Sequence, residues 1–318
     1  MGGAVVALPN ISICEEEYDL HVNDSDYYKR QYLTFVALAD GTFKFSGSTS
    51  ANTLSYSLDK GETWVALEHD TDTPTVNSGN SIMWKGNDLS ALSGSGIGVF
   101  ISSENFNVEG NIMSLLFGDN FEGQTSLAGK NFTFYCLFSG NTNVINAQNL
   151  VLPATILANN CYRQMFRMCT NLVTAPALPA TTLASVCYYM MFMDCTSLTS
   201  APELPAKTLG SYCYSYMFAN CRSLTSAPEL PAIILTYYCY RAMFMNCTSL
   251  TTAPELPATT LANYCYYMMF MNCTSLTGVP SNYLPATNLS LAPHERLPEI
   301  LVVPREKTPT GAAARGNP

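Results

Sequence analysis

Cysteine is the residue type whose spacing in this sequence could most readily do chemistry. The chain has 12 cysteines in 318 residues, and most of them fall into two columns that advance in steps of 26 residues. The first column is Cys161, Cys187, Cys213, Cys239 and Cys265. The second column is Cys169, Cys195, Cys221, Cys247 and Cys273. Thiols in such columns could form disulfides, bind a metal ion, or pack as small apolar side chains.

The spacing favours packed, reduced thiols. A zinc site uses ligands at close spacing such as C-x2-C, whereas seven residues separate the two cysteines of each unit. Neighbours within one column would lie in parallel register with their side chains pointing the same way, which disfavours a disulfide. A buried thiol packs like a small hydrophobic side chain. We therefore expect a thiol-lined core without metal or cofactor, with disulfides as the first alternative.

No other residue pattern indicates catalysis. His21, His69 and His294 have no nucleophile or ligand at motif spacing. The sequence contains no G-x-S-x-G motif, phosphate-binding loop or dinucleotide fingerprint. A carboxylate pair for glycoside hydrolysis stays an alternative, although no pattern points to one. We predict a protein that is not an enzyme, with no catalytic, cofactor-binding or metal-binding residues.

The same 26-residue step organises residues 131-290. The segment CYYMMFMDCTSLTSAPELPAKTLGSY, which begins at Cys187, returns at Cys213 as CYSYMFANCRSLTSAPELPAIILTYY and twice more downstream. Regular repeats occupy 161-290, and a degenerate first repeat occupies 131-160. One such unit buries too little surface to be stable alone, so the units should stack into a solenoid.

Each unit divides into an apolar stripe and a proline-rich stretch. The stripe has residues four apart, namely Leu209, Cys213, Met217 and Cys221. Phenylalanine widens it in every copy, at Phe166, Phe192, Phe218, Phe244 and Phe270. This spacing indicates a short helix, or a helical turn running into a 3₁₀ turn, with one buried face. Residues 198-201 then predict a short parallel strand, whose pairing should fail at Pro202 because proline has no N–H.

Variable columns of the repeat predict its exposed face, because core columns must stay fixed to keep their packing. One variable column is Arg163, Tyr189, Ser215, Arg241 and Tyr267. Another includes Arg167, Met193, Met245 and Met271. Tyrosine, arginine and methionine there would form an adaptable surface suited to partner recognition. Neutral drift on a solvated face is the alternative.

Residues 29-130 have a different composition, which is typical of an all-β sandwich. Short stretches such as YLTFVAL, GTFKFSG and NSIMWKG are rich in aromatic and β-branched residues and are separated by turn residues. Within this region, SLDKGETW resembles the Asp-box of sialidases and related β-proteins. Its motif residues are Ser57, Asp59, Gly61, Thr63 and Trp64. The resemblance implies a structural hairpin, since so short a region cannot hold a propeller; a sugar-binding module is the alternative.

The repeat unit, C-x-x-L-x-x-A-P-x-L-P-A…C-x-x-x-M-F-x-x-C, resembles the leucine-rich repeats of BspA-like surface proteins of the Bacteroides type. The family has an Ala-Phe pair, a cysteine, a leucine and a strand-ending proline at places that are held here by Met217, Phe218, Cys221, Leu224 and Pro231. The family's usual isoleucine is replaced by Cys213, and the unit is longer. The resemblance implies a leucine-rich-repeat solenoid on a bacterial or bacteriophage-associated surface, used for adhesion or recognition.

Charge and hydropathy limit the possible partners. The net charge is −9, and charged residues make up 12% of the chain against 47% hydrophobic residues. This balance argues against nucleic-acid binding and against a disordered chain. No apolar run reaches the length of a membrane-spanning segment. We read 1-28 as an acidic leader or linker without a clear signal peptide, and 291-318 as a disordered tail.

Together these patterns predict a chain that is mainly β with short helices, in which a β-sandwich precedes a leucine-rich-repeat solenoid. The predicted function is non-enzymatic recognition or adhesion at a cell surface or after secretion, through binding of a host protein or glycan to the solenoid. Self-association is a further option. The alternative is a structural subunit of a phage tail, fibre or surface assembly, and a glycoside hydrolase ranks third.

Overall fold

The computed structural model describes residues 27–46, 54–68, 70–86 and 98–277. The predicted acidic leader (except its last two residues), the end of the repeats at 278-290 and the predicted tail at 291-318 lie outside the described residues. The described chain is mainly β, with few short helices and no closed sheet. None of its helices is both long and apolar enough to cross a membrane.

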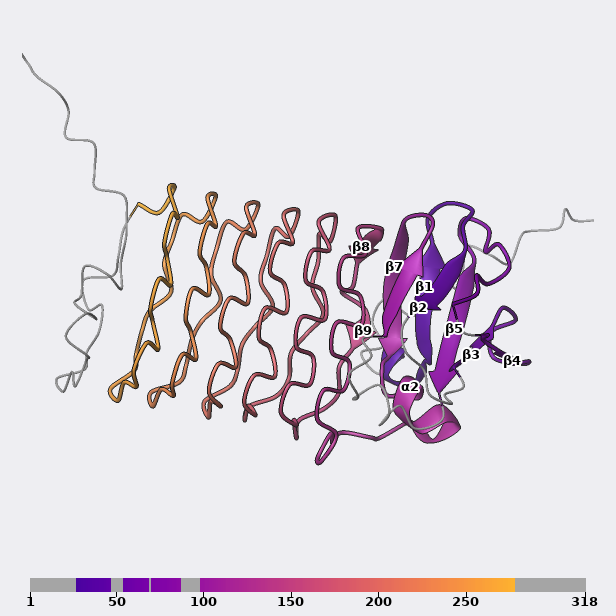
Figure 1. Cartoon of the computed structure of the whole chain (residues 1–318), viewed down its shortest axis with the longest axis horizontal. Coiled ribbons are helices and arrows are strands. Elements are labelled where there is room, and N and C mark those ends of the chain that lie inside the picture. The colour runs from indigo at the N-terminus through magenta and orange to yellow at the C-terminus, as the bar shows by residue number, and fades with distance from the viewer. Residues whose placement is uncertain (1–26, 47–53, 69, 87–97, 278–318) are drawn as a thin grey trace, which may run out of the picture.

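The N-terminal part contains two sheets (Figure 1). In chain order its elements are η1 (Tyr28–Arg30), β1 (Leu33–Ala37), β2 (Phe43–Ser46), β3 (Leu54–Ser57), β4 (Val65–Ala66), β5 (Ser81–Gly86), β6 (Val99–Ser102), β7 (Phe106–Asn111), α2 (Ser114–Phe117) and η3 (Gly118–Asn120). The larger sheet has the strand order β4-β3-β5-β1-β7, followed by β8 (Val144–Asn146), and β2 pairs with β6 in the smaller one. All pairs among β1 to β7 are antiparallel.

Aromatic side chains fill the space between these two sheets. Every second residue of β5 is buried, because successive side chains of a strand point to opposite faces. Phe35 of β1 lies at the centre, with its ring 5.4 Å from that of Phe43 in β2 and 4.9 Å from that of Phe100 in β6. The alternation in the sequence therefore produces one inward aromatic face on each sheet.

The repeats continue both sheets without a break in the core. Strands β8 (Val144–Asn146) and β9 (Leu150–Val151) pair in parallel with β7 and so extend the larger sheet. On the other side, the Phe100 N–H of β6 donates to the Leu137 carbonyl at 2.8 Å. The Phe100 ring stacks on Phe138, and Phe138 stacks on Phe166 at 5.2 Å. The N-terminal sheets thus cover the first end of the repeat stack (Figure 1).

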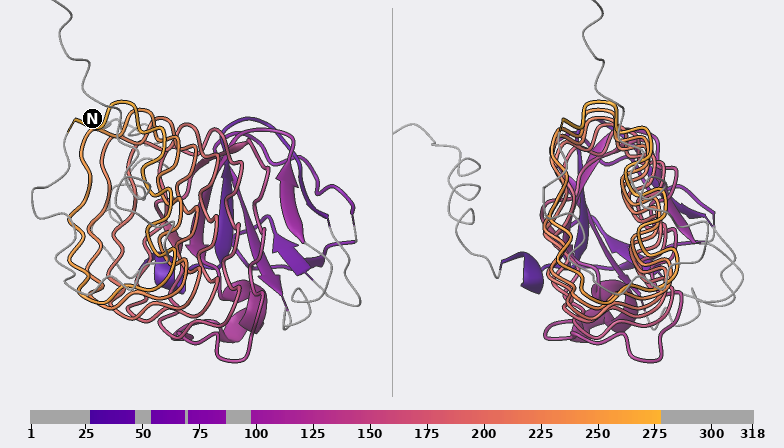
Figure 2. Two further views of the ribbon diagram at one scale, coloured as in Figure 1. Left: turned by 60° about the vertical axis from the view of Figure 1, so that its left-hand side comes forward. Right: turned by 90° about the vertical axis from the view of Figure 1, so that its left-hand side faces the viewer.

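Each 26-residue unit forms one coil with two walls, and the coils lie almost in superposition when viewed end-on (Figure 2). We call residues 184–195 and their equivalents at 158–169, 210–221, 236–247 and 262–273, with 130–141 of the first repeat, the turn wall. We call the intervening residues 170–183, 196–209, 222–235 and 248–261 the extended wall. Both walls therefore recur in each regular unit, and like residues lie over like.

The stretch predicted to be helical forms consecutive turns instead. The Cys213 N–H donates to the Gly210 carbonyl at 3.3 Å, and the Met217 N–H donates to the Tyr214 carbonyl at 3.1 Å. These bonds reach back three residues and occur at every second amide. Helix is assigned nowhere from 121 to 277. The prediction of a short helix in each unit is therefore wrong for the described repeats.

The remaining amides of the turn wall bond to the next coil, which is why no helix forms. The Tyr214 N–H donates to the Cys239 carbonyl at 3.0 Å, and the Phe218 N–H donates to the Met243 carbonyl at 2.9 Å. An α-helix would use these N–H groups within its own segment. Positive φ angles recur at every fourth residue, such as 56° at Tyr216, in the backbone that directs the alternate amides toward the next coil. Bonds between coils offset this unfavourable backbone conformation.

The extended wall pairs only at isolated points. The Thr251 N–H donates to the Thr225 carbonyl at 3.1 Å, and Ser226 forms a single parallel bridge with Thr252. Within the described residues, no amide from 226 to 232 donates to a backbone carbonyl. Pairing occurs near the predicted position and stops at the proline-rich stretch, but it is too short to form a strand.

Candidate recognition surface

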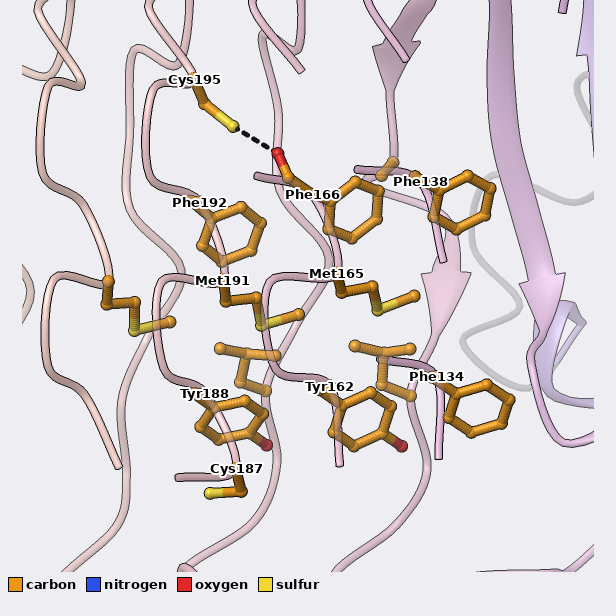
Figure 3. Packing of buried hydrophobic residues seen from close by; sticks show 14 of the residues in the cluster. Phe134, Phe138, Tyr162, Met165, Phe166, Cys187, Tyr188, Met191, Phe192 and Cys195 are labelled. Carbon is orange, nitrogen blue, oxygen red and sulfur yellow. Dashed lines mark hydrogen bonds between the residues drawn. The ribbon is translucent and has the colours of Figure 1, made fainter. Parts of the chain in front are cut away.

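Side chains of the turn wall alternate in pairs between the core and the outside. In the unit that begins at Cys187, residues 187-188 and 191-192 are buried, whereas 189-190 and 193-194 are partly exposed. Figure 3 shows the buried members directed into the space between the walls. The chain thus follows a repeating order of two residues in and two residues out, with a period of four.

The inward columns form continuous files of stacked rings (Figure 3). Adjacent phenylalanine rings from Phe138 to Phe270 are 5.2 to 5.7 Å apart, and adjacent tyrosine rings from Tyr162 to Tyr266 are 5.7 to 6.0 Å apart. The five phenylalanines and ten cysteines predicted for the core are all buried. These files hold the coils in register, because each ring packs on its copy in the next unit.

The thiols of the second column bond to the preceding coil. The Cys195 Sγ donates to the Phe166 carbonyl at 3.0 Å (Figure 3), and the following units repeat the contact. Burial raises the pKa of Cys161 to about 12 and that of Cys195 well above its usual range. No described cysteine is in a disulfide, and no described group of three or more His, Cys, Asp or Glu residues is arranged to hold a metal. These thiols stay protonated at neutral pH and act as packing groups.

The outward columns gather tyrosines and arginines on the outer side of the turn wall. We call this set the tyrosine–arginine surface. Its members are Tyr135, Arg163, Tyr189, Tyr212, Tyr216, Tyr237, Tyr238, Arg241, Tyr264 and Tyr267. The members are half-buried, apart from Tyr237, which is 41% exposed. They come from neighbouring coils, so the surface exists only because the coils stack.

Arg163 lies between two tyrosine rings of adjacent coils. Its guanidinium carbon is 5.3 Å from the centre of the Tyr135 ring and 5.1 Å from that of Tyr189. One terminal nitrogen, Nη1, donates to Asn160 Oδ1 at 3.2 Å. Its Nε is buried and has no hydrogen-bond partner. The guanidinium is therefore held in place by ring faces and one amide, with donors left to offer.

Arg241 has the same environment three coils further along. Its guanidinium carbon is 5.2 Å from the Tyr216 ring centre, 5.0 Å from that of Tyr238 and 5.8 Å from that of Tyr267. Its Nε is also buried without a partner. Neither Arg241 nor Arg163 forms an ion pair with a described residue. Each arginine keeps its charge uncompensated inside a cluster of tyrosines.

Stacked tyrosines fill the neighbouring column. The rings of Tyr212 and Tyr238 are 4.8 Å apart, as are those of Tyr238 and Tyr264. The second pair is inclined by only 7°. A hydrogen bond with Tyr237 is the largest cause that raises the pKa of Tyr238 to about 12. The Tyr238 ring is therefore covered on both faces by Tyr212 and Tyr264, and its hydroxyl is engaged with Tyr237.

The chain matches no protein-family model, no curated protein and no solved structure. What the surface can bind follows from its side chains. Tyrosine and arginine are the residues most enriched where binding energy is concentrated in protein interfaces. Rings fixed by stacking also lose little conformational freedom when a partner binds.

The structure divides the predicted binding residues into three groups. Arg163, Tyr189, Arg241 and Tyr267 belong to the tyrosine–arginine surface. Arg167, Met193, Met245 and Met271 are half-buried on the outer side of the turn wall, one outward pair further along the chain. Ser215 is 0% exposed, so its prediction as a surface residue is wrong. Its side chain is too short to reach past the arginine and tyrosines that occupy its column and the next.

Sequence reasoning missed six of the ten members of the surface. Tyr212, Tyr238 and Tyr264 occupy one column that was not predicted, Tyr216 and Tyr237 lie in two others, and Tyr135 belongs to the degenerate first repeat. The sequence does contain a pattern that indicates these columns, because a strict four-residue period with two adjacent buried residues places the other two on the outside. Interpreting the stripe as a helix led to a different set of exposed positions.

An asparagine ladder borders the surface. The Asn220 side chain donates to Asp194 Oδ1 at 2.6 Å, the Asn246 side chain donates to Asn220 Oδ1 at 2.7 Å, and the Asn272 side chain continues the series at 2.8 Å. Because each amide both accepts and donates, the ladder links one coil to the next. It fixes the spacing of the outward columns beside it.

The Asp-box residues close the hairpin between β3 and β4. Asp59 accepts hydrogen bonds from the hydroxyl of Ser57 at 2.7 Å and the N–H of Thr63 at 2.9 Å. Bonds from Thr63 are the largest cause that lowers the pKa of Asp59 to about 2. The Trp64 indole N–H donates to the Gly61 carbonyl at 3.1 Å. In this geometry the carboxylate organises a turn.

Proposed function

We propose that this protein is a non-enzymatic recognition protein, which binds a host protein or glycan through the tyrosine–arginine surface at a cell surface or after secretion. The observation that carries the proposal is the clustering of tyrosines with two uncompensated arginines on one outer wall. Such side chains combine large contact area with hydrogen-bond donors.

The architecture supports this proposal. We infer that the repeats form a leucine-rich-repeat solenoid of the BspA-like kind and that the N-terminal sheets form a β-sandwich. Support for the solenoid comes from the buried Leu198, Leu224 and Leu250, which recur once per coil. Support for the sandwich comes from the aromatic contacts between β1, β2 and β6. A stack of this kind presents an extended surface without needing a pocket.

The experiment uses the full chain on an array of host proteins and glycans. Captured ligands are then measured with Tyr238→Ala and with Thr225→Ala, an exposed residue of the extended wall, as the matched control. We expect Tyr238→Ala to weaken binding at least about tenfold, as truncation of a hot-spot residue does. The control should bind like the unaltered chain. Equal binding by all three proteins, with thermal unfolding showing each to be folded, would contradict the proposal.

One observation favours a second function, a subunit of a phage tail, fibre or surface assembly. Ile233 and Ile234 are adjacent on the extended wall and are 54% and 59% exposed. Exposed apolar neighbours are typical of a contact with another chain. Light scattering on the concentrated protein would show oligomers that Ile234→Thr disperses, whereas a strict monomer would count against this function.

A further inference from the structure

Two cations on the tyrosine–arginine surface lack an anionic partner. Neither Arg163 nor Arg241 forms an ion pair with a described carboxylate. A half-buried charge without a counter-ion attracts an anion. A partner that offers anionic oxygens to the terminal guanidinium nitrogens would compensate the charge at both positions.

The charge on this face is opposite to that of the whole chain. The chain has a net charge of −9, yet the repeat's exposed carboxylates Glu203, Glu229 and Glu255 all lie on the extended wall. Asp194, on the turn wall, already accepts a bond from the side chain of Asn220. The tyrosine–arginine surface is therefore locally cationic and complementary to an acidic partner.

The tyrosine geometry favours a protein over a sugar. A sugar ring stacks on an open aromatic face, but both faces of Tyr238 are covered, by Tyr212 on one side and by Tyr264 on the other. The ring faces of Tyr135 and Tyr189 hold the guanidinium of Arg163. The ring edges of this row suit the backbone and side chains of a peptide.

The spacing of the two arginines sets the length of the occupant. Arg163 and Arg241 are three coils apart in one column, and their guanidinium carbons lie 5.1 and 5.8 Å from the rings of Tyr189 and Tyr267, the next residues of that column. Three such steps separate the guanidiniums by roughly 16 Å, and an extended strand rises about 3.3 Å per residue with side chains alternating between faces. Two carboxylates four residues apart lie on the same face of such a strand and are about 13 Å apart.

From these observations we infer that the surface binds an extended acidic segment of a partner protein, laid across the coils, with carboxylates four residues apart at Arg163 and Arg241. This inference rests on the proposed recognition function and specifies its ligand. Each carboxylate would accept the free N–H groups of one guanidinium, a charge-assisted bond. The tyrosine edges between them would contact the intervening residues.

Fluorescence anisotropy with the full chain tests this inference. The probe is a labelled peptide of serine, threonine and valine that carries two glutamates four residues apart. Matched peptides carry the glutamates three residues apart or carry glutamine in their place. We expect the peptide whose glutamates are four residues apart to bind most tightly. The glutamine peptide should bind at least about tenfold more weakly. Binding of the acidic peptides should weaken as the salt concentration is raised.

Variants of the chain locate the binding. Arg163→Gln and Arg241→Gln should each weaken binding of the peptide whose glutamates are four residues apart, by at least about tenfold. Arg222→Gln removes the same charge from an exposed residue that contacts no described tyrosine ring, and it should bind like the unaltered chain. Retained affinity in both Arg163→Gln and Arg241→Gln, or equal affinity for the acidic and glutamine peptides, would overturn the inference.

Failure of the inference and failure of the proposed function can be told apart. If no acidic peptide binds, but a ligand found on the array is lost with Tyr238→Ala, the surface recognises another chemistry and only the inference falls. A sulfated or uronic-acid glycan captured through Arg163 would have the same meaning. If the ligands found on the array bind Tyr238→Ala as tightly as the unaltered chain, the proposed function is contradicted as well.

Discussion

The two walls of each coil show opposite relations between sequence and hydrogen bonding. The extended wall has a strand-like sequence, yet within the described repeats its bonds between coils are few and isolated. The turn wall has a helix-like stripe, yet one coil donates five backbone bonds to the next, from Tyr212, Tyr214, Tyr216, Phe218 and Asn220. The wall that lacks regular secondary structure therefore holds the stack together, and it also carries the tyrosine–arginine surface.

This difference has a physical cause in proline and in side-chain packing. Proline in the extended wall removes N–H groups that a parallel ladder needs. In the turn wall every inward side chain stacks on its own copy, so the backbone is held at a distance where alternate amides reach the next coil. Stable stacking makes the outward columns rigid enough to serve recognition.

High pH should have the largest effect, and it should act on the turn wall. Burial raises the pKa of Cys161 and Cys239 to about 12 from an ordinary value of 9.0. The pKa values of Tyr188 and Tyr214 also lie well above 10.0 because of burial. Their contribution to stability is complete below the unfolded-state pKa and is lost as pH rises toward the folded-state value. Urea titrations from pH 7 to 11 should show stability falling above about pH 9.

Iodoacetamide labelling provides the control for this prediction. Native protein at pH 8 should leave the described cysteines unmodified, and protein in urea should lose that protection. Rapid labelling of Cys161 or Cys239 in the native state would show that these thiols are not enclosed in the core.

Phe218→Ala should have the next largest effect. Phe218 is 0% exposed and stacks 5.7 Å from both Phe192 and Phe244. Removing a fully buried phenylalanine costs about 3–5 kcal/mol. Glu229→Ala, on the exposed extended wall, should change stability by less than about 0.5 kcal/mol. Denaturant unfolding measures both losses. Equal losses in the free energy of unfolding of the two variants would contradict the proposed difference between the walls.

Asn246→Ala should have an intermediate effect. The Asn246 side chain donates to Asn220 and accepts from Asn272, so its removal leaves two ladder groups unpaired. Because these groups are part-buried or exposed and water can replace the lost bonds, we expect a loss of about 0.5–1.5 kcal/mol, measured by thermal or denaturant unfolding. Thr251→Ala, which removes a hydroxyl that bonds to the Thr225 carbonyl on the extended wall, is the matched control and should cost less. The reverse order would place the tighter contact between coils on the extended wall.

The smallest effect is expected in the N-terminal sheets, at Asp59. The pKa of this carboxyl is lowered to about 2 from 3.8 by hydrogen bonds from Thr63 and Ser57. Its contribution to stability is therefore present above about pH 4 and is lost as pH falls toward 2. Trp64 fluorescence during acid titration should report loosening of the hairpin in that window. Asp59→Asn should remove that transition while leaving the repeats folded; an unchanged transition would show that Asp59 does not control it.

The repeat and its buried residues were predictable from the sequence, whereas the backbone was not. The spacing of Leu209, Cys213, Met217 and Cys221 identified buried positions, all of which are buried in the structure. Four-residue steps drift by about 40° each around a helix of 3.6 residues per turn. A stripe kept for three such steps leaves the core face of a helix, so the strict period already contradicted one.

Other features depend on contacts that a single sequence does not display. Tyrosine has no intrinsic preference for positive φ, and Tyr212 and Tyr216 adopt it because bonds to the next coil require it. The pairing of β7 with β8 and β9 joins the two predicted parts of the chain across a change in composition. Ser215 was mistaken for a surface residue because the variability of a repeat column does not show whether larger neighbouring side chains cover a small one.

Amide hydrogen exchange, resolved by residue, is the most direct test of the claim that the turn wall is the rigid scaffold of the recognition surface. We predict strong protection at Tyr212, Tyr214, Tyr216, Phe218 and Asn220, whose amides bond to the next coil. Fast exchange is predicted between 226 and 232, where no amide donates to a described backbone carbonyl. Protection confined to the extended wall, with fast exchange along the turn wall, would contradict the account.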